Sequence, residues 1–162
     1  MKQNIQQFCH DGASCTEKMI RINEQISLRV LCFTPIKKWT YPIVMIGGLI
    51  TAIENFKDVF RELSKDFTIY YINTREKISA EINGEVEFDI ETMGKDVVSV
   101  IQQLGLNDAK YALIGYSMGA TIASDCYRFL QSKPAHLVLI EPTPVFHYPR
   151  WSIKLVSWFG VT

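Results

Sequence analysis

The sequence has no excess of charge of either sign and no long apolar run. Lysine and arginine together number 17, as do aspartate and glutamate, so the formal net charge at pH 7 is +0. Proteins that bind nucleic acid through its phosphates usually present a basic surface, which this composition does not supply. Residues 1–4 lead into polar sequence rather than into the apolar core of a signal peptide. We therefore expect no nucleic-acid partner and no transmembrane segment.

Cysteine is scarce, and its four positions are scattered. Cys9, Cys15, Cys32 and Cys126 have no paired spacing, which predicts reduced thiols and a cytoplasmic protein. Together with His10, the first two could begin a metal site, but no second Cys/His pair completes it. The phosphate-binding motifs G-x-G-x-x-G and G-x-x-x-x-G-K-[ST] are absent as well. We therefore predict neither a metal nor a cofactor.

What the sequence does contain is an alternation of apolar strands with amphipathic helices. At 162 residues and 48% hydrophobic content, the chain suits one globular domain. Fully apolar strands joined by helices predict a mostly parallel sheet with helices on both faces. We expect an α/β fold of about six strands, at residues 19–22, 26–31, 43–46, 67–72, 111–114 and 137–140.

Three helices are predicted between these strands, and two stretches are polar and poorly patterned. The third helix runs from Thr121 to Leu130, and Gly105 closes the second in the C′ position. Residues 1–18 form a polar lead-in, and residues 73–88 a polar loop. The predicted apolar faces consist of Phe56, Val59, Phe60 and Leu63 in the first helix and Met93, Val97, Ile101 and Leu104 in the second.

The most informative stretch is Gly115-Tyr116-Ser117-Met118-Gly119, between an apolar strand and a helix. In that context Gly-x-Ser-x-Gly is typical of a nucleophile elbow, a sharp turn that exposes a serine. The residues two before and two after the serine come close together in so tight a turn, so both must lack bulk. The helix dipole also favours an anion near Ser117. The alternative interpretation is an ordinary serine N-cap.

The order of these elements resembles the front part of the α/β-hydrolase superfamily, from residue 19 to about residue 142. The resemblance implies an incomplete α/β-hydrolase fold, because the superfamily has an eight-stranded sheet with the elbow after the fifth strand. It divides the chain into the lead-in at 1–18, a hydrolase-like core at 19–142, and the start of a cap or lid segment at 143–162.

The same resemblance implies roles for particular residues. Ser117 would attack the acyl carbon of a small ester or thioester, and the Met118 N–H would be one oxyanion-hole donor. The Leu49 N–H would be the second donor, because it follows Gly47 and Gly48, which stand where the family has a His-Gly pair. A residue without a Cβ lets backbone amides approach a ligand closely.

The chain departs from the superfamily's pattern in two places. The usual Asp-x-Arg-Gly-x-Gly stretch after the fourth strand is replaced by Asn73-Thr74-Arg75-Glu76. The superfamily also places its acid and its histidine after the serine, normally beyond the seventh and eighth strands. Here Glu141 is a candidate acid, or alternatively a solvated turn residue. His147 is a candidate base, or alternatively a surface histidine.

Two functions remain open. The first is a serine hydrolase that acts on esters or thioesters through an acyl-serine, present as a truncated or split form with weak activity alone. The alternative is a non-catalytic, hydrolase-like binding or interaction module. A histidine within hydrogen-bond reach of Ser117 would discriminate between them. In either case the strand at residues 137–140 would lie at an exposed sheet edge, which predicts self-association or a complementing chain.

Overall fold

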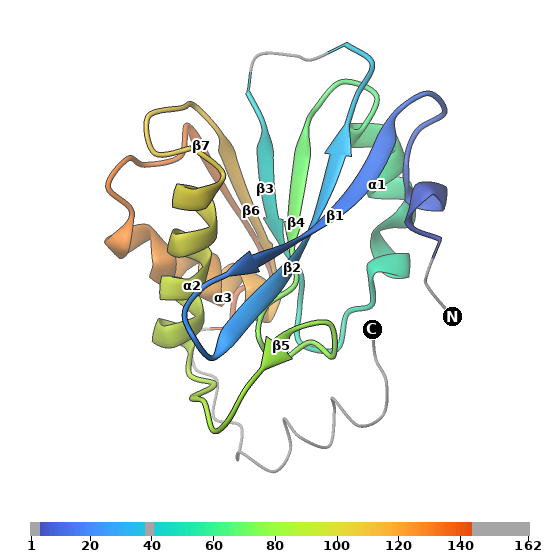
Figure 1. Ribbon diagram of the computed structural model, residues 1–162. Coiled ribbons are helices and arrows are strands. Elements are labelled where there is room, and N and C mark those ends of the chain that lie inside the picture. Colours follow the sequence, from blue (N-terminus) through green and yellow to red (C-terminus); the bar gives the residue numbers. More distant parts are fainter. Residues whose placement is uncertain (1–3, 38–40, 144–162) are drawn as a thin grey trace.

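The computed structural model describes residues 4–37 and 41–143, and these form one twisted sheet with helices packed against it (Figure 1). Within these residues the sheet has seven strands in the order β1-β2-β4-β3-β6-β7, and β5 pairs with β2 off this path. The expected α/β sheet is confirmed. The strands are β1 (Ser14–Arg21), β2 (Ile26–Thr34), β3 (Ile43–Ile46), β4 (Ile69–Ile72), β5 (Glu81–Ile82), β6 (Ala112–Tyr116) and β7 (His136–Ile140).

The centre of the sheet is parallel and one side is antiparallel. Strand β3 lies between β4 and β6 and is parallel to both, and β7 continues the parallel pairing beyond β6. Strand β2 pairs antiparallel with β1, β4 and β5. Because parallel strands end at the same edge, the loops that follow β3, β4, β6 and β7 share one rim.

Helices cover the two faces unequally. Helices α2 (Ile90–Gln103) and α3 (Met118–Cys126) pack against one face. Helix α1 (Lys57–Leu63) and the 3₁₀ turns η1 (Ile5–Phe8) and η2 (Ile53–Phe56) pack against the other. This two-sided burial explains why the central strands are apolar at successive positions.

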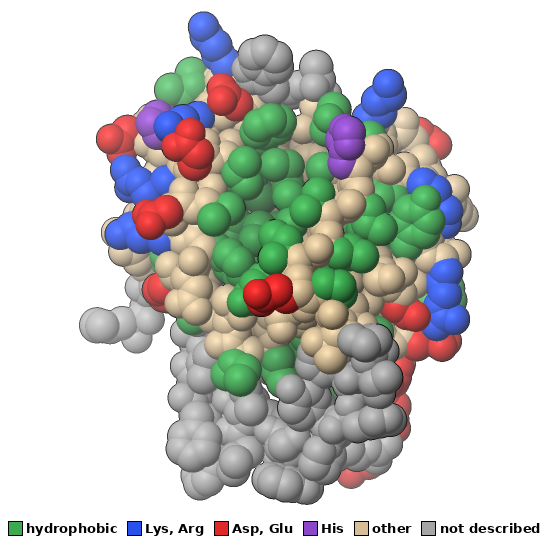
Figure 2. All heavy atoms as spheres, turned by 180° about the vertical axis from the view of Figure 1, so that it is seen from behind, with side chains coloured by type: hydrophobic (Ala, Val, Ile, Leu, Met, Phe, Trp, Pro, Cys, Tyr) green, Lys and Arg blue, Asp and Glu red, His purple; other side chains and the backbone are tan. Residues whose placement is uncertain are grey.

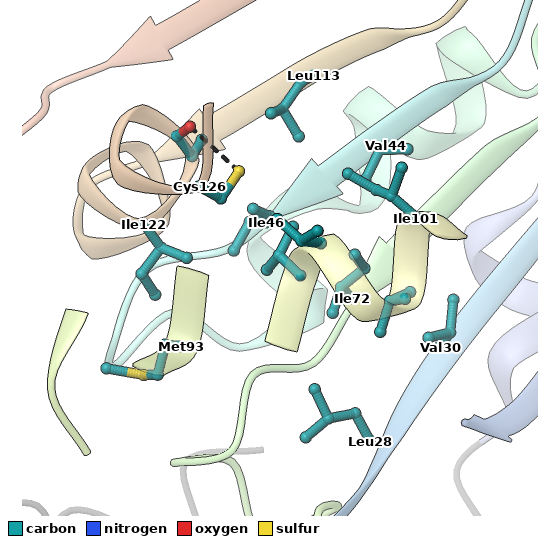
Figure 3. Packing of buried hydrophobic residues seen from close by; sticks show 14 of the residues in the cluster. Leu28, Val30, Val44, Ile46, Ile72, Met93, Ile101, Leu113, Ile122 and Cys126 are labelled. Carbon is teal, nitrogen blue, oxygen red and sulfur yellow. Dashed lines mark hydrogen bonds between the residues drawn. The ribbon is translucent and has the colours of Figure 1, made fainter. Parts of the chain in front are cut away.

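Strand β3 shows how the two cores share one strand. Its side chains alternate, so Val44 and Ile46 join the core beneath α2 and α3, whereas Ile43 and Met45 join the core beneath α1. In Figure 3, Val44 and Ile46 lie among side chains of α2 and α3. Fully burying each such side chain contributes about 1.5–3 kcal/mol.

Both ends of α2 are capped. The Asp89 carboxylate accepts a hydrogen bond from the Thr92 N–H at 2.8 Å, which satisfies one free donor of the first turn. At the other end Gly105 has a φ of 71°, while the Leu106 N–H donates to the Ile101 carbonyl at 3.1 Å. This is a Schellman closure, and the C′ position predicted for Gly105 is confirmed.

Three segments differ from the sequence prediction. Strand β1 begins at Ser14 rather than at residue 19, although most of its side chains are exposed. As an edge strand it needs only the backbone ladder to β2, so polar residues do not end it. Within the predicted loop 73–88, residues 81–82 form β5. Helix α3 ends at Cys126 and gives way to the 3₁₀ turn η3 (Tyr127–Phe129).

The predicted face of the first helix is wrong at one position. Val59 is 43% exposed, whereas Phe56 and Phe60 are buried. Phe56 belongs to η2, whose tighter 3₁₀ turn is out of phase with the α-helix that follows. Spacing counted from Phe56 therefore places Val59 on the wrong side. The predicted start of a cap at 143–162 lies, apart from Thr143, outside the described residues.

Strand β7 has an open edge in the described part of the chain. Among the described strands it pairs with β6 alone, and Leu137, Val138 and Ile140 are 37%, 41% and 43% exposed. Hydrophobic side chains also gather across the middle of the rear face of the molecule (Figure 2). An unpaired apolar edge without lysine is a template for pairing with another chain.

We therefore expect the 162-residue chain to self-associate, or to need a complementing chain, in a concentration-dependent way that light scattering would detect. Val138→Lys should weaken this association, because a charge on an edge strand opposes pairing. Met19→Lys is the matched control, since Met19 is 45% exposed on β1 at the opposite edge. A stable monomer at high protein concentration would contradict the prediction.

Candidate active site

Ser117 lies at a sharp turn between β6 and α3, on the rim where the parallel strands end. Its φ of 53° and ψ of −122° are unusual for a residue with a side chain. Such a conformation costs about 1–3 kcal/mol and persists only where its surroundings impose it. The carbonyl of Ser117 accepts hydrogen bonds from the N–H groups of Ala120 and Thr121, at 2.9 and 3.2 Å. Ser117 is therefore the N-cap of helix α3, which starts directly after it.

Close backbone packing explains the two glycines of the motif. A Cβ on Gly115 would lie 2.4 Å from the Gly119 carbonyl oxygen and 2.5 Å from the Ala120 Cα. A Cβ on Gly119 would lie 2.4 Å from the carbonyl oxygens of Ile46 and Gly47, at the end of β3. The elbow thus packs against itself and against the neighbouring strand, with no room for a side chain at either position.

The loop after β3 comes close to the serine. A Cβ on Gly48 would lie 3.1 Å from the Ser117 Cβ, and one on Gly47 would lie 2.3 Å from the Tyr71 hydroxyl. The N–H groups of Leu49 and Met118 find no hydrogen-bond acceptor within residues 4–37 and 41–143. Both residues are buried, and buried backbone N–H groups without a partner are rare.

The profile described as alpha/beta hydrolase fold matches residues 41–160. The chain belongs to this family. A comparison with curated proteins finds no significant match.

Solved alpha/beta hydrolase structures resemble the chain at low sequence identity. The N-formylmaleamic acid deformylase of Pseudomonas putida is 21% identical, with a TM-score of 0.65 over 85% of this chain and 53% of that chain. The epoxide hydrolase CorEH is also 21% identical, with a TM-score of 0.65 over 88% and 49%. E-2-(acetamidomethylene)succinate hydrolase is 18% identical, with a TM-score of 0.67 over 83% and 47%. The chain spans about half the length of these proteins.

The candidate acid of this hydrolase-family chain lies on the same rim as the serine. Glu141 directly follows β7, and the preceding residue, Ile140, accepts a hydrogen bond from the Ser117 N–H at 2.9 Å. Glu141 is exposed and has a φ of 53°, one of two positive values among the described non-glycine residues. Strained backbone at a rim is a reason to test such a residue for function.

The described histidines lie away from the serine, and His147 is outside the described residues. His136 begins β7 beside Ala112, at the far end of the strands, and its ring centroid lies 5.8 Å from that of Tyr41. The backbone N–H of His10 donates to the Ser64 hydroxyl, just beyond α1. No histidine among residues 4–37 and 41–143 therefore stands at the Ser117 rim.

Sequence reasoning missed a buried charged segment after β4. Arg75, Glu76 and Lys77 are only 3–7% exposed. The Arg75 guanidinium donates to both Asp96 carboxylate oxygens at 2.7 Å and to the Glu87 carbonyl at 2.5 Å. The available signal was the run of charges directly after an apolar strand, at the end where ligands bind in such folds.

Lys77 and Glu76 lie beneath the loop that carries Leu49. The Lys77 ammonium donates to the carbonyls of Gly48 and Leu49 at 2.6 and 2.7 Å, and its Nζ is 3.9 Å from Glu76 Oε1. Glu76 Oε1 accepts from the Thr74 hydroxyl, whereas Oε2 is buried without a partner in the described structure. Burial raises the pKa of Glu76 and lowers the pKa of Lys77, and each partner's charge opposes the other's shift.

All four cysteines, two of which were considered as metal ligands, lie within the described residues. Cys9, Cys15, Cys32 and Cys126 are free thiols. No group of three or more metal-binding side chains occurs within the described ranges. Among the helices of these ranges, none has the length and apolar character needed to cross a membrane.

Proposed function

We propose that the chain carries the nucleophile of a serine hydrolase that cleaves carboxylic esters or thioesters. The observation behind the proposal is the strained turn that presents Ser117 beside the Gly48 backbone. Nearby, the N–H groups of the buried residues Leu49 and Met118 have no acceptor among the described residues. The Ser117 hydroxyl would attack the acyl carbon and lose its proton to a base. The alcohol or thiol would leave, and water would then hydrolyse the acyl-serine.

The two amides would stabilise the charge that develops on the acyl oxygen. Preorganised N–H donors are worth most in a site from which water is excluded, and removing one costs about 10²–10³-fold in kcat. Leu49 and Met118 are 7% and 3% exposed, which suits this role. Gly47, Gly48, Gly115 and Gly119 would support the site by keeping the backbone close to the serine.

A base is the component that the described rim does not supply. Glu141 is our candidate acid because it follows the strand that binds the Ser117 N–H. His147 is the candidate base within the sequence. A serine hydroxyl without a positioned base is almost never ionised at neutral pH, and such a base contributes about 10²–10⁴-fold. We therefore propose weak activity for the 162-residue chain alone.

The test measures labelling by a fluorophosphonate probe and turnover of p-nitrophenyl esters. We expect the isolated chain to stay near background in both assays. Adding a segment that supplies the family's last two strands and histidine should raise both signals. Ser117→Ala should abolish the gain, because the nucleophile and the base act as a unit. Thr121→Ser, one turn into α3, is a mild control that should keep it.

Two outcomes would contradict this proposal. If the added segment binds but no Ser117-dependent labelling appears, the chain is better described as a non-catalytic binding module. Vigorous Ser117-dependent turnover by the isolated chain would instead show that a base is already present. His147→Ala would then decide whether His147, paired with Glu141, is that base.

A further inference from the structure

Within the described residues, the hydrogen bonds of the buried Lys77 ammonium all go to the loop after β3. Its ammonium has three N–H donors, and three carbonyls of the loop after β3 accept from it: Gly48 at 2.6 Å, Leu49 at 2.7 Å and Thr51 at 3.4 Å. The side chain is 6% exposed. Glu76 is the acidic group that faces it, at 3.9 Å. Lys77 thus binds the loop from below, through charge-assisted hydrogen bonds.

The geometry of the peptide group links this contact to Ser117. The carbonyl of Gly48 and the N–H of Leu49 belong to one planar unit, and no described peptide bond is cis. In a trans peptide the two groups point in opposite directions. A carbonyl held against Lys77 therefore turns the Leu49 N–H away from Lys77. The same loop approaches Ser117, since a Cβ on Gly48 would lie 3.1 Å from the Ser117 Cβ.

We propose that Lys77 is a positioning residue that fixes the Leu49 N–H in the orientation of an oxyanion donor and strengthens it as a donor. The inference rests on the proposed hydrolase function. A cation at the carbonyl draws electron density from the amide, which makes its N–H a better hydrogen-bond donor. The residue acts through the Gly48–Leu49 peptide and does not contact the reacting atoms.

The cost of burying this lysine supports a role in positioning rather than in stability. Removing an ammonium from water is unfavourable, and buried ion pairs are often replaceable by apolar residues without loss of stability. Glu76 stands at 3.9 Å, beyond hydrogen-bond distance, and its Oε2 has no partner in the described structure. The close contacts of Lys77 are instead hydrogen bonds to the loop carbonyls. An apolar side chain could not donate these bonds.

The first test observes the amide itself by ¹⁵N NMR on the 162-residue chain. Lys77→Met keeps the length of the side chain and removes the ammonium, so the Leu49 N–H resonance should move and its hydrogen exchange should accelerate. Lys65→Met is the control, because Lys65 lies just beyond α1, pairs with Glu62 at the surface and should leave Leu49 unchanged. An unchanged Leu49 amide in a folded Lys77→Met chain would overturn the inference.

A pH titration of the wild-type chain tests the inference even if Lys77→Met does not fold. As pH rises, loss of the Lys77 proton should shift the Leu49 resonance, with an inflection below the ordinary lysine value of about 10.4 because burial lowers the pKa of Lys77. In the titration of the Leu49 resonance, Glu76→Gln should remove any inflection at acidic pH, which would come from Glu76. It should keep the alkaline inflection, which comes from Lys77. A Leu49 amide that shows no alkaline inflection would count against the contact.

Ester turnover by the complemented chain completes the test. Lys77→Met should lower kcat by about 10–100-fold, less than loss of the donor itself, with KM little changed. Lys77→Arg should recover part of the rate, because it restores a cation at the loop. Unaltered kcat in Lys77→Met would overturn the positioning role. If wild-type Ser117 shows no activity at all, the hydrolase proposal fails, while the NMR result still decides how Lys77 orients the amide.

Discussion

Gly119→Val is expected to destabilise the chain by several kcal/mol, enough to unfold many domains, whose total stability is about 5–15 kcal/mol. Any Cβ at this position would lie 2.4 Å from two carbonyl oxygens at the end of β3. Those atoms are backbone, so they cannot swing aside as the end of a side chain could. The elbow would have to separate from β3 to make room. Urea unfolding followed by circular dichroism would measure the loss.

Two further variants separate the steric effect from other causes. Gly119→Ala adds only the Cβ and should already give a large part of the loss. Gly105→Ala is the matched control, because Gly105 has a φ of 71° but no atom within 4 Å of its Cβ position. Its cost should be about 1–2 kcal/mol, from backbone conformation alone. A Gly119→Val chain as stable as the wild type would rule out the packing described for the elbow.

Arg75→Met is expected to cost about 3–5 kcal/mol, because it leaves the Asp96 carboxylate buried without its partner. Asp96 is 3% exposed, and both of its oxygens accept from Arg75. Burial raises the pKa of Asp96, and the hydrogen bonds from Arg75 oppose that rise. Loss of the guanidinium should therefore raise this pKa further. Thermal and urea unfolding at neutral pH would report the destabilisation.

The double variant Arg75→Met with Asp96→Leu is the informative control. It removes both charges, so it should be more stable than Arg75→Met alone. Lys95→Met breaks an exposed pair with Glu91 and a cation–π contact with Phe129, and it should leave the unfolding midpoint nearly unchanged. If Arg75→Met matched Lys95→Met in stability, the buried pair would have no structural importance.

Most of the sheet could be predicted because most of its strands are recognisable from their own residues. The segments at β3, β4 and β6 are short apolar runs, and burial on both faces is what such runs require. The apolar run at β7 also marks a strand, although most of its side chains are exposed. Strand β1 extends five residues further back than predicted, since an edge strand is fixed by its neighbour rather than by its own hydrophobicity. Val59 was misplaced because helical spacing was counted across a change from 3₁₀ to α geometry.

The strained turn at Ser117 could be predicted from the sequence. The parts of the site that depend on contacts between residues distant in sequence could not. The glycines around Ser117 leave a local motif, and the structure confirms the strand-to-helix turn there. Lys77 contacts Gly48 across 29 positions, and Arg75 contacts Asp96 across 21. The sequence around Lys77 does not indicate that it binds Gly48, and the sequence around Arg75 does not indicate that it binds Asp96. The catalytic roles of Ser117, Leu49, Met118, Glu141 and His147 stay predictions.

The hydrogen bond from the Ser117 N–H to the Ile140 carbonyl has a mechanical consequence. It ties the elbow to the end of β7, whose outer edge has no partner among the described residues. A strand docking on that edge would stiffen β7 and, through this single bond, restrict the motion of the elbow without touching the serine. Pairing of another strand with β7 would thus limit the mobility of Ser117, which follows the neighbouring strand β6.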